Sequence, residues 1–271
     1  MNYNKLVNHI CAWLKQRFQL AGKTVAVVGV SGGIDSAVVS TLCAMAGLRV
    51  RAISMPVRGK GSPLAQVHLD FLLELYPESV EAHVSDIGLT LKASIQEFNQ
   101  KPDGLQLANL QSRIRMTRLY LFASNDGLVV GTGNKVEDFG LGFFTKYGDG
   151  GVDLSPIGNL LKSEVRMVAR TLFLNPDIIN VTPTDGLWEP GSGHDTDEEA
   201  LGITYNEAEE VLKLHELLTE LGSDISVADA KKHIADPIVE LNYGVFRHWH
   251  DSTRHKMSMP PVCIIPEDIY D

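Results

Sequence analysis

The sequence predicts an α/β protein with a doubly wound parallel sheet flanked by helices. Short apolar stretches rich in β-branched residues alternate with stretches in which apolar residues recur at helical spacing. The 271 residues are 44% apolar and 21% charged, a globular composition that excludes disorder, collagen and coiled coil. No stretch approaches the roughly 20 uninterrupted apolar residues of a membrane helix.

The first part of the chain predicts two parallel strands joined by a helix. Residues 24–30 (TVAVVGV) are almost wholly apolar, as in a strand buried on both faces of a sheet. A helix over 35–46 ends at Gly47, and a second strand over 49–55 stops at Pro56. The two strands begin about 25 residues apart, which suits a right-handed βαβ crossover.

The same alternation continues along the chain. We expect helices over 63–75, 107–123, 161–172 and 205–221, and strands over 81–85 and 127–131. The C-terminal region is polar, and the loops 57–62 and 184–199 are either lids over a ligand or surface excursions. We expect the whole chain, 1–271, to form one domain that binds ligands at the carboxyl ends of its strands.

Charge and cysteine content narrow the class of protein. The net charge of −10 means that any polyanionic ligand must be held by a local basic site. Three cysteines, Cys11, Cys43 and Cys263, without a C-x-x-C pair argue against a disulfide scaffold or zinc ribbon. Residues 1–16 lack the apolar run of a signal peptide, so we expect a cytoplasmic protein.

A turn rich in glycine and serine follows the first predicted strand. It consists of Gly29, Val30, Ser31, Gly32, Gly33, Ile34, Asp35 and Ser36. Glycines let the backbone approach a ligand closely, and free N–H groups at a helix N-terminus bind phosphate. Asp35 would repel phosphate unless a cation lay between them, which suits Mg²⁺. Two alternatives remain: Asp35 as a simple helix cap, and a G-x-S-x-G nucleophile elbow with Ser31 as nucleophile.

A second segment, residues 131–153, begins where the predicted strand 127–131 ends. It holds four acids, two lysines and seven glycines. Glycines cost conformational entropy and like charges repel, so folding alone does not explain this composition. The mixture of acids and bases suits a site that holds Mg²⁺, phosphates and a carboxylate together.

Both segments resemble a known family. The motif S-G-G-x-D-S at 31–36 resembles the pyrophosphate loop of the N-type ATP pyrophosphatases. Residues 131–153 resemble the NAD synthetase signature, GT-x-x-x-x-E followed by F-F-T-K-Y-G-D-G-x-x-D, and 109–116 resemble the arginine helix of that family. The resemblance covers essentially the full chain. It implies the adenine nucleotide alpha-hydrolase-like, Rossmann-type fold, without a glutaminase domain.

The resemblance also implies an activity. The chain would be an ammonia-dependent NAD synthetase, a ligase that amidates deamido-NAD in the last step of NAD biosynthesis. ATP would be cleaved to AMP and pyrophosphate through an NAD-adenylate, with Mg²⁺ bound. The family is homodimeric, with the dinucleotide site near the subunit interface.

Site residues carry over from the family by position. The turn 29–36, Thr132, Lys162 and Thr184 would bind ATP. The ligands of Mg²⁺ would be Asp35 and Glu137. Because the span from Glu137 to Lys146 is one residue longer than the commoner pattern, Asp138 is the alternative metal ligand.

The remaining roles concern the other two substrates. The deamido-NAD contacts would be Arg113, Lys146, Asp153, His255 and Lys256. The catalytic residues would be Asp35, Lys162 and Asp149, the last as the acid that handles ammonia. Simpler alternatives are an exposed helix lysine for Lys162 and a turn residue for Asp149. Trp188 either covers the nucleotide or anchors its loop.

Three other functions are alternatives to this one. Another AMP-forming ligase is disfavoured by residues 143–153, and a tRNA-modifying pyrophosphatase by the acidic balance of the chain. A nucleotide-sensing binding protein without turnover is the alternative from a different class. Asp35→Asn separates it from the synthetase, because a sensor would keep its function.

Overall fold

The computed structural model describes residues 1–57, 59, 61–98, 100–184, 186–187, 196–221 and 236–269. Its centre is a sheet of four parallel strands in the order β3-β2-β1-β4. The strands are β1 (Val25–Gly29), β2 (Arg49–Ser54), β3 (Val80–Val84) and β4 (Gly127–Val129). The strand order reverses between β1 and β4, so the carboxyl ends of these two strands form the crevice where such sheets bind ligands.

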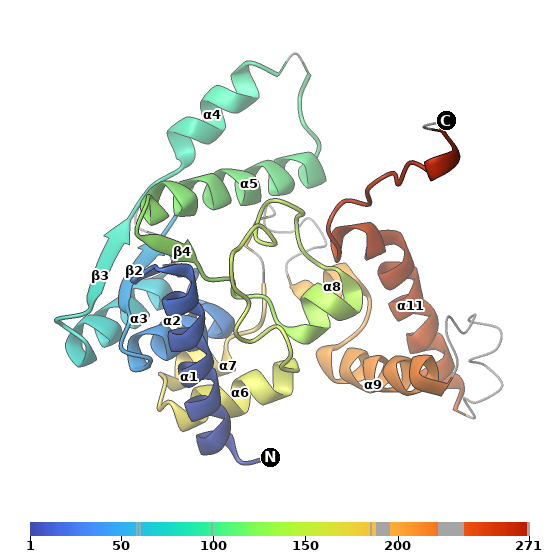
Figure 1. Cartoon of the computed structure of the whole chain (residues 1–271), viewed down its shortest axis with the longest axis horizontal. Coiled ribbons are helices and arrows are strands. Elements are labelled where there is room, and N and C mark those ends of the chain that lie inside the picture. The colour runs from blue at the N-terminus through green and yellow to red at the C-terminus, as the bar shows by residue number, and fades with distance from the viewer. Residues whose placement is uncertain are drawn as a thin grey trace.

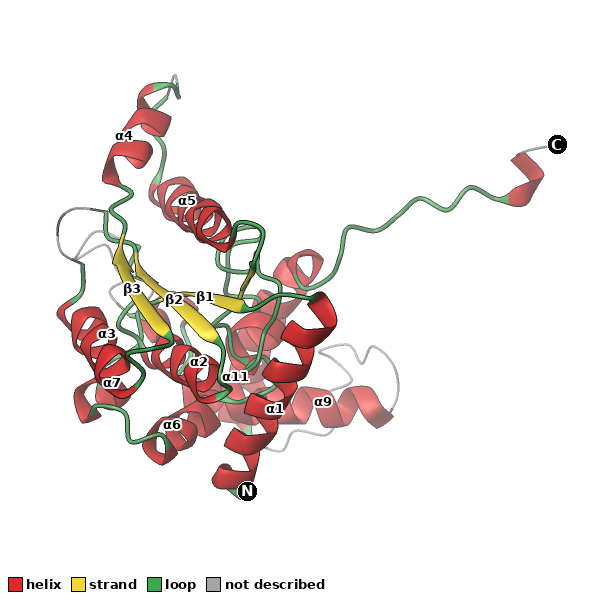
Figure 2. Cartoon of the chain, turned by 60° about the vertical axis from the view of Figure 1, so that its left-hand side comes forward, coloured by secondary structure: helices red, strands yellow, loops and turns green. Residues whose placement is uncertain are grey.

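Helices cover both faces of the sheet (Figures 1 and 2). One face carries α1 (Tyr3–Ala21), α2 (Ile34–Met45), α3 (Pro63–Leu75), α6 (Lys162–Thr171) and α7 (Pro176–Asn180). The other face carries α4 (Gly88–Gln96) and α5 (Gly104–Ala123). The doubly wound α/β prediction is therefore confirmed.

Strand β1 is buried on both faces, as its apolar run predicts. Ala26 and Val28 pack into the hydrophobic cluster on the α2 face, whereas Val25 and Val27 pack with Ala123 of α5 on the other face. Since the strand is almost completely shielded from water, its carboxyl end has a fixed position. The turn that follows β1 is thus built on a rigid support.

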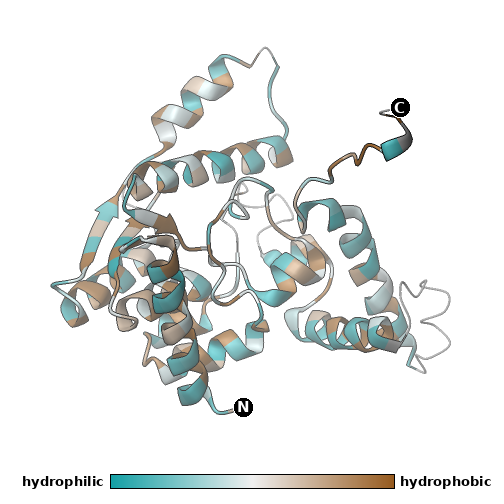
Figure 3. Cartoon of the chain, viewed as in Figure 1, coloured by the Kyte–Doolittle hydropathy of each residue, from teal (hydrophilic) through white to brown (hydrophobic). Residues whose placement is uncertain are grey.

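A third hydrophobic cluster lies beside the sheet. It is formed by the π-helix η1 (Lys135–Leu141), α8 (Asp197–Leu201), α9 (Tyr205–Leu221) and α11 (Pro237–Thr253). Short 3-10 turns, η2 (Arg254–Lys256) and η3 (Glu267–Ile269), follow α11. Figure 3 shows teal and brown residues mixed along these helices, as expected where only one side of each is buried. The cluster holds η1 against the carboxyl edge of the sheet.

Most of the predicted elements are present, with shifted ends. The helices over 63–75 and 205–221 have the predicted bounds. The strand predicted over 127–131 ends at Val129, because Val130 and Gly131 turn to pair with Leu154, whose carbonyl accepts from the Gly131 N–H at 2.7 Å.

Two predictions about loops and the C-terminal region are wrong. The region expected to be merely polar contains α11, whose Tyr243 and Phe246 are completely buried against α9 and η1. Helix α8 begins at Asp197, inside the loop expected over 184–199. Helices α1, α4 and α7 were not among the predicted elements. The single domain over 1–271 stays a prediction.

The described residues bear on the expectations about membrane helices and cysteines. None of their helices combines the length and apolar character needed to span a bilayer. Cys11, Cys43 and Cys263 are free thiols, with Cys43 buried and Cys263 exposed. Burial raises the pKa of both the Cys11 and Cys43 thiols, so neither is an activated nucleophile.

Candidate active site

The glycine turn joins β1 to the N-terminus of α2. Gly32 has a φ of +94°, and a Cβ there would lie 2.7 Å from the Ser62 hydroxyl and 2.8 Å from the Ala65 nitrogen. Only glycine therefore fits between this turn and the start of α3. Residue Gly33, which precedes α2, has no side chain to cap the first N–H groups of the helix. These donors can face an anion at the end of β1.

Hydroxyl groups brace this turn internally. The Ser36 hydroxyl donates to the Gly33 carbonyl at 2.9 Å and lies 3.3 Å from the Ser31 hydroxyl, which accepts from the Gly33 N–H at 3.2 Å. Within the described residues, the Ser31 hydroxyl has no histidine partner. These bonds fix the shape of the turn, and the Ser31 hydroxyl lacks the base that a nucleophile elbow requires.

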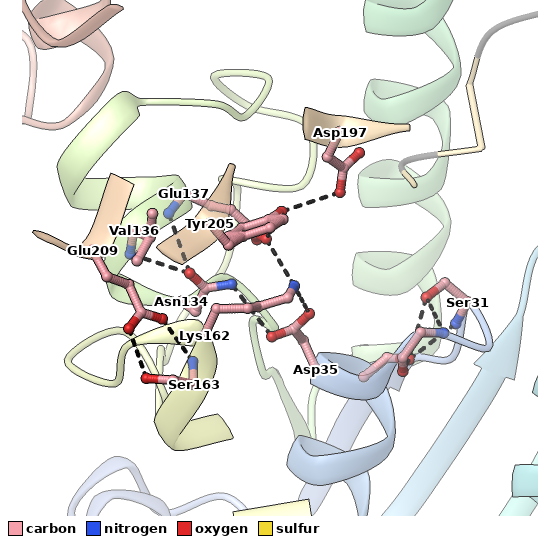
Figure 4. A network of polar contacts seen from close by, with 12 residues as sticks. Ser31, Asp35, Asn134, Val136, Glu137, Lys162, Ser163, Asp197, Tyr205 and Glu209 are labelled. Carbon is pink, nitrogen blue, oxygen red and sulfur yellow. Dashed lines mark hydrogen bonds and ion pairs between the residues drawn. The ribbon is translucent and has the colours of Figure 1, made fainter. Parts of the chain in front are cut away.

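Three charged side chains meet directly beside the turn. Lys162, at the start of α6, lies with its Nζ 2.6 Å from Asp35 Oδ2 and 2.9 Å from Glu137 Oε1. Only 3% of the lysine side chain is exposed, against 17% for each carboxylate. Figure 4 shows the ammonium group between the two acids, which come from α2 and η1. We call Asp35, Glu137 and Lys162 the charge cluster.

The charge cluster stabilises the ionised forms of its lysine and one acid. Burial lowers the pKa of Lys162, but the two carboxylates outweigh burial and raise that pKa above its ordinary value. Burial likewise raises the pKa of Glu137, yet the Lys162 charge and hydrogen bonds from Lys162 and Tyr205 lower it overall. For Asp35, burial dominates and raises the pKa despite Lys162. Lys162 therefore stays an ammonium in this dry setting.

Neighbouring polar groups hold the charge cluster in place. Asn134 accepts from the N–H groups of Val136 and Glu137 at the start of η1 and donates to Asp35 Oδ1 at 3.3 Å. At the start of α6, Glu209 accepts from the N–H and hydroxyl of Ser163, both at 2.7 Å. Asn134 and Glu209 thus hold the starts of η1 and α6, the two helices that carry Glu137 and Lys162.

The two carboxylates fit a magnesium ion that is shared with phosphates. Mg²⁺ is usually held by one or two carboxylates together with substrate phosphates. Asp35 and Glu137 already converge on one cation, the Lys162 ammonium. The described part of the chain has no group of three or more acidic, His or Cys side chains able to hold a metal by itself. The arrangement suits Mg·ATP better than a metal bound by protein alone.

Asp138 is oriented differently from Glu137. Its carboxylate packs against Gly133, where a Cβ would collide with it. Burial, and then the charges of Glu137, Asp149 and Asp35, raise the pKa of Asp138 well above its ordinary value. Because it is Glu137 that contacts the cation also held by Asp35, the geometry favours Glu137 as the metal ligand.

Asp149 lies in the loop that packs on α5. Its Oδ1 accepts from the Ser112 hydroxyl at 2.6 Å and from the Thr145 N–H at 3.0 Å. The Thr145 hydroxyl in turn donates to Asn109 at 2.7 Å. Two donors therefore hold the Asp149 carboxylate in one orientation. An aspartate that serves only to form a turn would not need the bond from Ser112, which comes from a separate helix.

Four of the five residues expected to bind deamido-NAD are linked to one another through the backbone. Arg113 Nε lies 3.4 Å from the Lys146 carbonyl, and Lys146 Nζ donates to the His255 carbonyl at 2.7 Å. Lys256 Nζ donates to the Phe144 carbonyl at 2.6 Å. The fifth, Asp153, accepts instead from the Val129 N–H at 2.8 Å and from the Tyr120 hydroxyl.

The other expected ATP contacts, Thr132 and Thr184, are not hydrogen-bonded to the charge cluster in the described part of the chain. Thr132 precedes Asn134, which donates to Asp35, by two positions. The Thr184 hydroxyl accepts from the Gly186 N–H at 3.2 Å. Trp188 and most of the predicted loop 184–199 lie outside the described residues.

Several residues of the site carried no recognisable sequence signal. They are Asn134, Tyr205 and Glu209 around the charge cluster and Ser112 beside Asp149. Asn134 precedes the acids of the second segment, so its place in the motif could have drawn attention to it. A single Tyr or Glu at the start of an amphipathic helix is indistinguishable from ordinary helix composition.

Known proteins resemble this chain along almost its entire length. A family model described as NAD synthase matches residues 6–260. The NH(3)-dependent NAD(+) synthetase of Archaeoglobus fulgidus is 39% identical over 267 residues, which cover 97% of each chain. A solved structure of NMN synthetase from Francisella tularensis has 28% identity and a TM-score of 0.78, covering 98% of this chain and 99% of that chain. The NH3-dependent NAD synthetase from Campylobacter jejuni, solved with nitrate, has 27% identity and a TM-score of 0.76, covering 97% and 100%.

Proposed function

The chain belongs to the NAD synthase family, an ATP-using family of amide-forming ligases, and from that premise we propose that it is an ammonia-dependent NAD synthetase. It converts deamido-NAD, ATP and ammonia to NAD, AMP and pyrophosphate. The observation that carries this proposal is the charge cluster beside an anion-binding turn at the crevice between β1 and β4. Such a cluster suits a reaction in which phosphate charge is redistributed.

The first step activates an inert carboxylate. An oxygen of the nicotinate carboxylate attacks the α-phosphorus of ATP, forming an O–P bond while the bond from that phosphorus to the bridging oxygen breaks. Pyrophosphate leaves with the bonding electron pair. The N–H groups at the start of α2 receive the departing phosphates, and Lys162 offers its charge to the phosphorus that becomes five-coordinate.

Two acids of the chain would hold the magnesium ion that accompanies ATP. When bound, Mg²⁺ supplies positive charge to the phosphate oxygens. Asp35 and Glu137 would hold it, since they already share one cation. Closure of the site against water would protect the adenylate from hydrolysis.

The second step replaces AMP by ammonia. Neutral ammonia attacks the carboxyl carbon of the adenylate, the C–O bond to AMP breaks, and one proton is lost as the amide forms. We propose that Asp149 binds the ammonium ion and accepts a proton from it, because Ser112 and Thr145 fix its carboxylate in the loop 143–153.

The dinucleotide would bind at the linked residues on the outer side of this loop. Arg113, Lys146, His255 and Lys256 converge there, and Asp153 lies at its end. We include the homodimer in the proposal, with the dinucleotide site near its interface, and a cytoplasmic location.

Product analysis tests the proposed function. Protein is mixed with ATP, Mg²⁺, deamido-NAD and ammonium, and the products are separated. We expect NAD, AMP and pyrophosphate in equal amounts. Release of ADP and phosphate, or AMP formation without NAD, would overturn the proposal.

A second candidate substrate is the mononucleotide. The Francisella tularensis protein, which resembles this chain over nearly its full length, is an NMN synthetase. Amidation of nicotinate mononucleotide uses the same two steps, since the nicotinate carboxylate is identical. Comparison of kcat/KM for the two substrates decides between them, and we expect deamido-NAD to be preferred.

A further inference from the structure

Tyr205 is the first residue of α9, in the third hydrophobic cluster beside the sheet. Its side chain contacts the charge cluster. Its ring is buried, with 2% exposed. Its hydroxyl lies 2.6 Å from Glu137 Oε1 and 3.2 Å from Asp197 Oδ2. Figure 4 shows the ring above Lys162, with the hydroxyl between the two acids. None of the steps described for the reaction uses this residue.

The Tyr205 hydroxyl donates to Glu137. A tyrosine hydroxyl is protonated near neutral pH, so it can donate to the Glu137 carboxylate at 2.6 Å. A phenol has one hydrogen to donate, and the shorter of its two contacts is the one to Glu137. A donor bond to an ionised acceptor is among the stronger hydrogen bonds of proteins.

Tyr205 also contacts the lysine that shares this acid. Lys162 Nζ lies 4.9 Å from the centre of the Tyr205 ring, within the range of a cation–π interaction. Lys162 Nζ and the Tyr205 hydroxyl both contact Oε1 of Glu137. Two donors on one oxygen restrict rotation of the carboxylate.

The neighbouring acid lacks such support. Asp138 accepts no hydrogen bond in the described ranges, whereas Glu137 is fixed by Tyr205 and Lys162. The difference between two adjacent acids thus comes from the partners that α9 and α6 provide.

We propose that Tyr205 is a positioning residue that fixes Glu137 for binding Mg·ATP. It acts through Glu137 and touches no reacting atom. The inference rests on the proposed function, because it requires Glu137 to be a metal ligand of the ATP site. It explains why Glu137, and not Asp138, serves in that role.

The test removes only the hydroxyl group. Tyr205→Phe is compared with Tyr243→Phe, a matched control in which an equally buried tyrosine of α11 loses a hydroxyl that contacts His215. ATP binding is measured by calorimetry with and without Mg²⁺, alongside the Mg²⁺ concentration that half-saturates turnover. We expect Tyr205→Phe to weaken Mg·ATP binding about tenfold and to raise the half-saturating Mg²⁺ concentration. ATP binding without Mg²⁺ should stay within about twofold of wild type, as should every value for Tyr243→Phe.

A double-mutant cycle shows whether Tyr205 acts through Glu137. In a Glu137→Gln background, Tyr205→Phe should cause no further loss of Mg·ATP binding. Equal weakening with and without Mg²⁺, or an undiminished effect in the Glu137→Gln background, would overturn the inference. Wild-type protein that forms no NAD and AMP would instead refute the proposed function.

Discussion

Lys162 is the residue on which the electrostatics of the site depend. Its ammonium is almost completely buried and is shared between two carboxylates from separate elements. A buried ion pair adds little net stability over an apolar alternative, but loss of one partner leaves uncompensated charge. Removal of the lysine should therefore cost stability, whatever its role toward a ligand.

Replacement of Lys162 by Met should destabilise the protein in a pH-dependent way. At pH 7.5 we expect a loss of about 3–5 kcal/mol in the free energy of unfolding, because Asp35 and Glu137 face each other without a cation. In the variant, burial and mutual repulsion raise both carboxyl pKa values above their unfolded values. Stability is then retained at acid pH and lost as the pH rises through the raised values.

Urea denaturation at pH 4.5 and pH 7.5 measures this effect. Lys135→Met is the control, since Lys135 forms a more exposed ion pair with Glu216 at 2.7 Å and should cost less than about 1 kcal/mol. An equal loss at both pH values for Lys162→Met would show that the two carboxylates are not its cause.

Asp35→Asn distinguishes a synthetase from a nucleotide sensor. The amide keeps the size of the side chain at the start of α2 but loses the charge that Lys162 contacts at 2.6 Å. We expect turnover to fall by about 10²–10³ while circular dichroism stays unchanged. A sensor would release no pyrophosphate in either form, so ATP binding that Asp35→Asn leaves unchanged, without pyrophosphate release by the wild type, would favour the sensor.

At the scale of elements, the sequence predicts a helix or strand well when the pattern that determines it lies within the segment itself. The buried run of β1 and the spacing within α3 are local patterns, so their types and approximate ends were predictable. Helix α11 was missed because Tyr243 and Phe246 are spread among polar residues and make sense only against α9 and η1.

The same distinction holds for the candidate site. Asp35 lies in a contiguous motif, whereas Tyr205 contacts Glu137 across 68 positions of the chain. No pattern within one segment can indicate that contact, and the residues expected from the family resemblance contain no hint of it.

Helices α2 and α3 share a buried contact that should make the fold acid-sensitive. His68 of α3 is 1% exposed, and its Nε2 lies 2.8 Å from the Ser40 hydroxyl of α2. Burial lowers the pKa of His68 from 6.5 to about 4. Between these values the unfolded chain binds more protons, so stability falls as the pH drops from about 6.5 to about 4.

His68→Gln removes this dependence, because glutamine can still bond to Ser40 but does not titrate. The wild-type free energy of unfolding should fall by about 3 kcal/mol more than that of the variant over this range. His215, with its pKa also lowered to about 4 mainly by burial, keeps a residual slope in both proteins. Parallel pH profiles for the two proteins would contradict this account of His68.

At the scale of the whole molecule, the fold assembles one site from distant parts of the chain. Asp35 and Lys162 are 127 positions apart, yet both stand at helix starts near the carboxyl edge of the sheet. The turn 29–36 follows a strand of the sheet, whereas η1 and α9 belong to the third hydrophobic cluster beside it. The loop 143–153, which contains Asp149, lies between η1 and α9 in the chain and packs on α5 through Ser112.

In the proposed reaction, a carboxylate oxygen of the substrate attacks the α-phosphorus at this site. Deamido-NAD carrying ¹⁸O in both carboxylate oxygens tests it most directly, with mass spectrometry of the products. The account predicts one ¹⁸O atom in each AMP released, one in the amide of NAD and none in pyrophosphate. Unlabelled AMP, or label in pyrophosphate or phosphate, would contradict it.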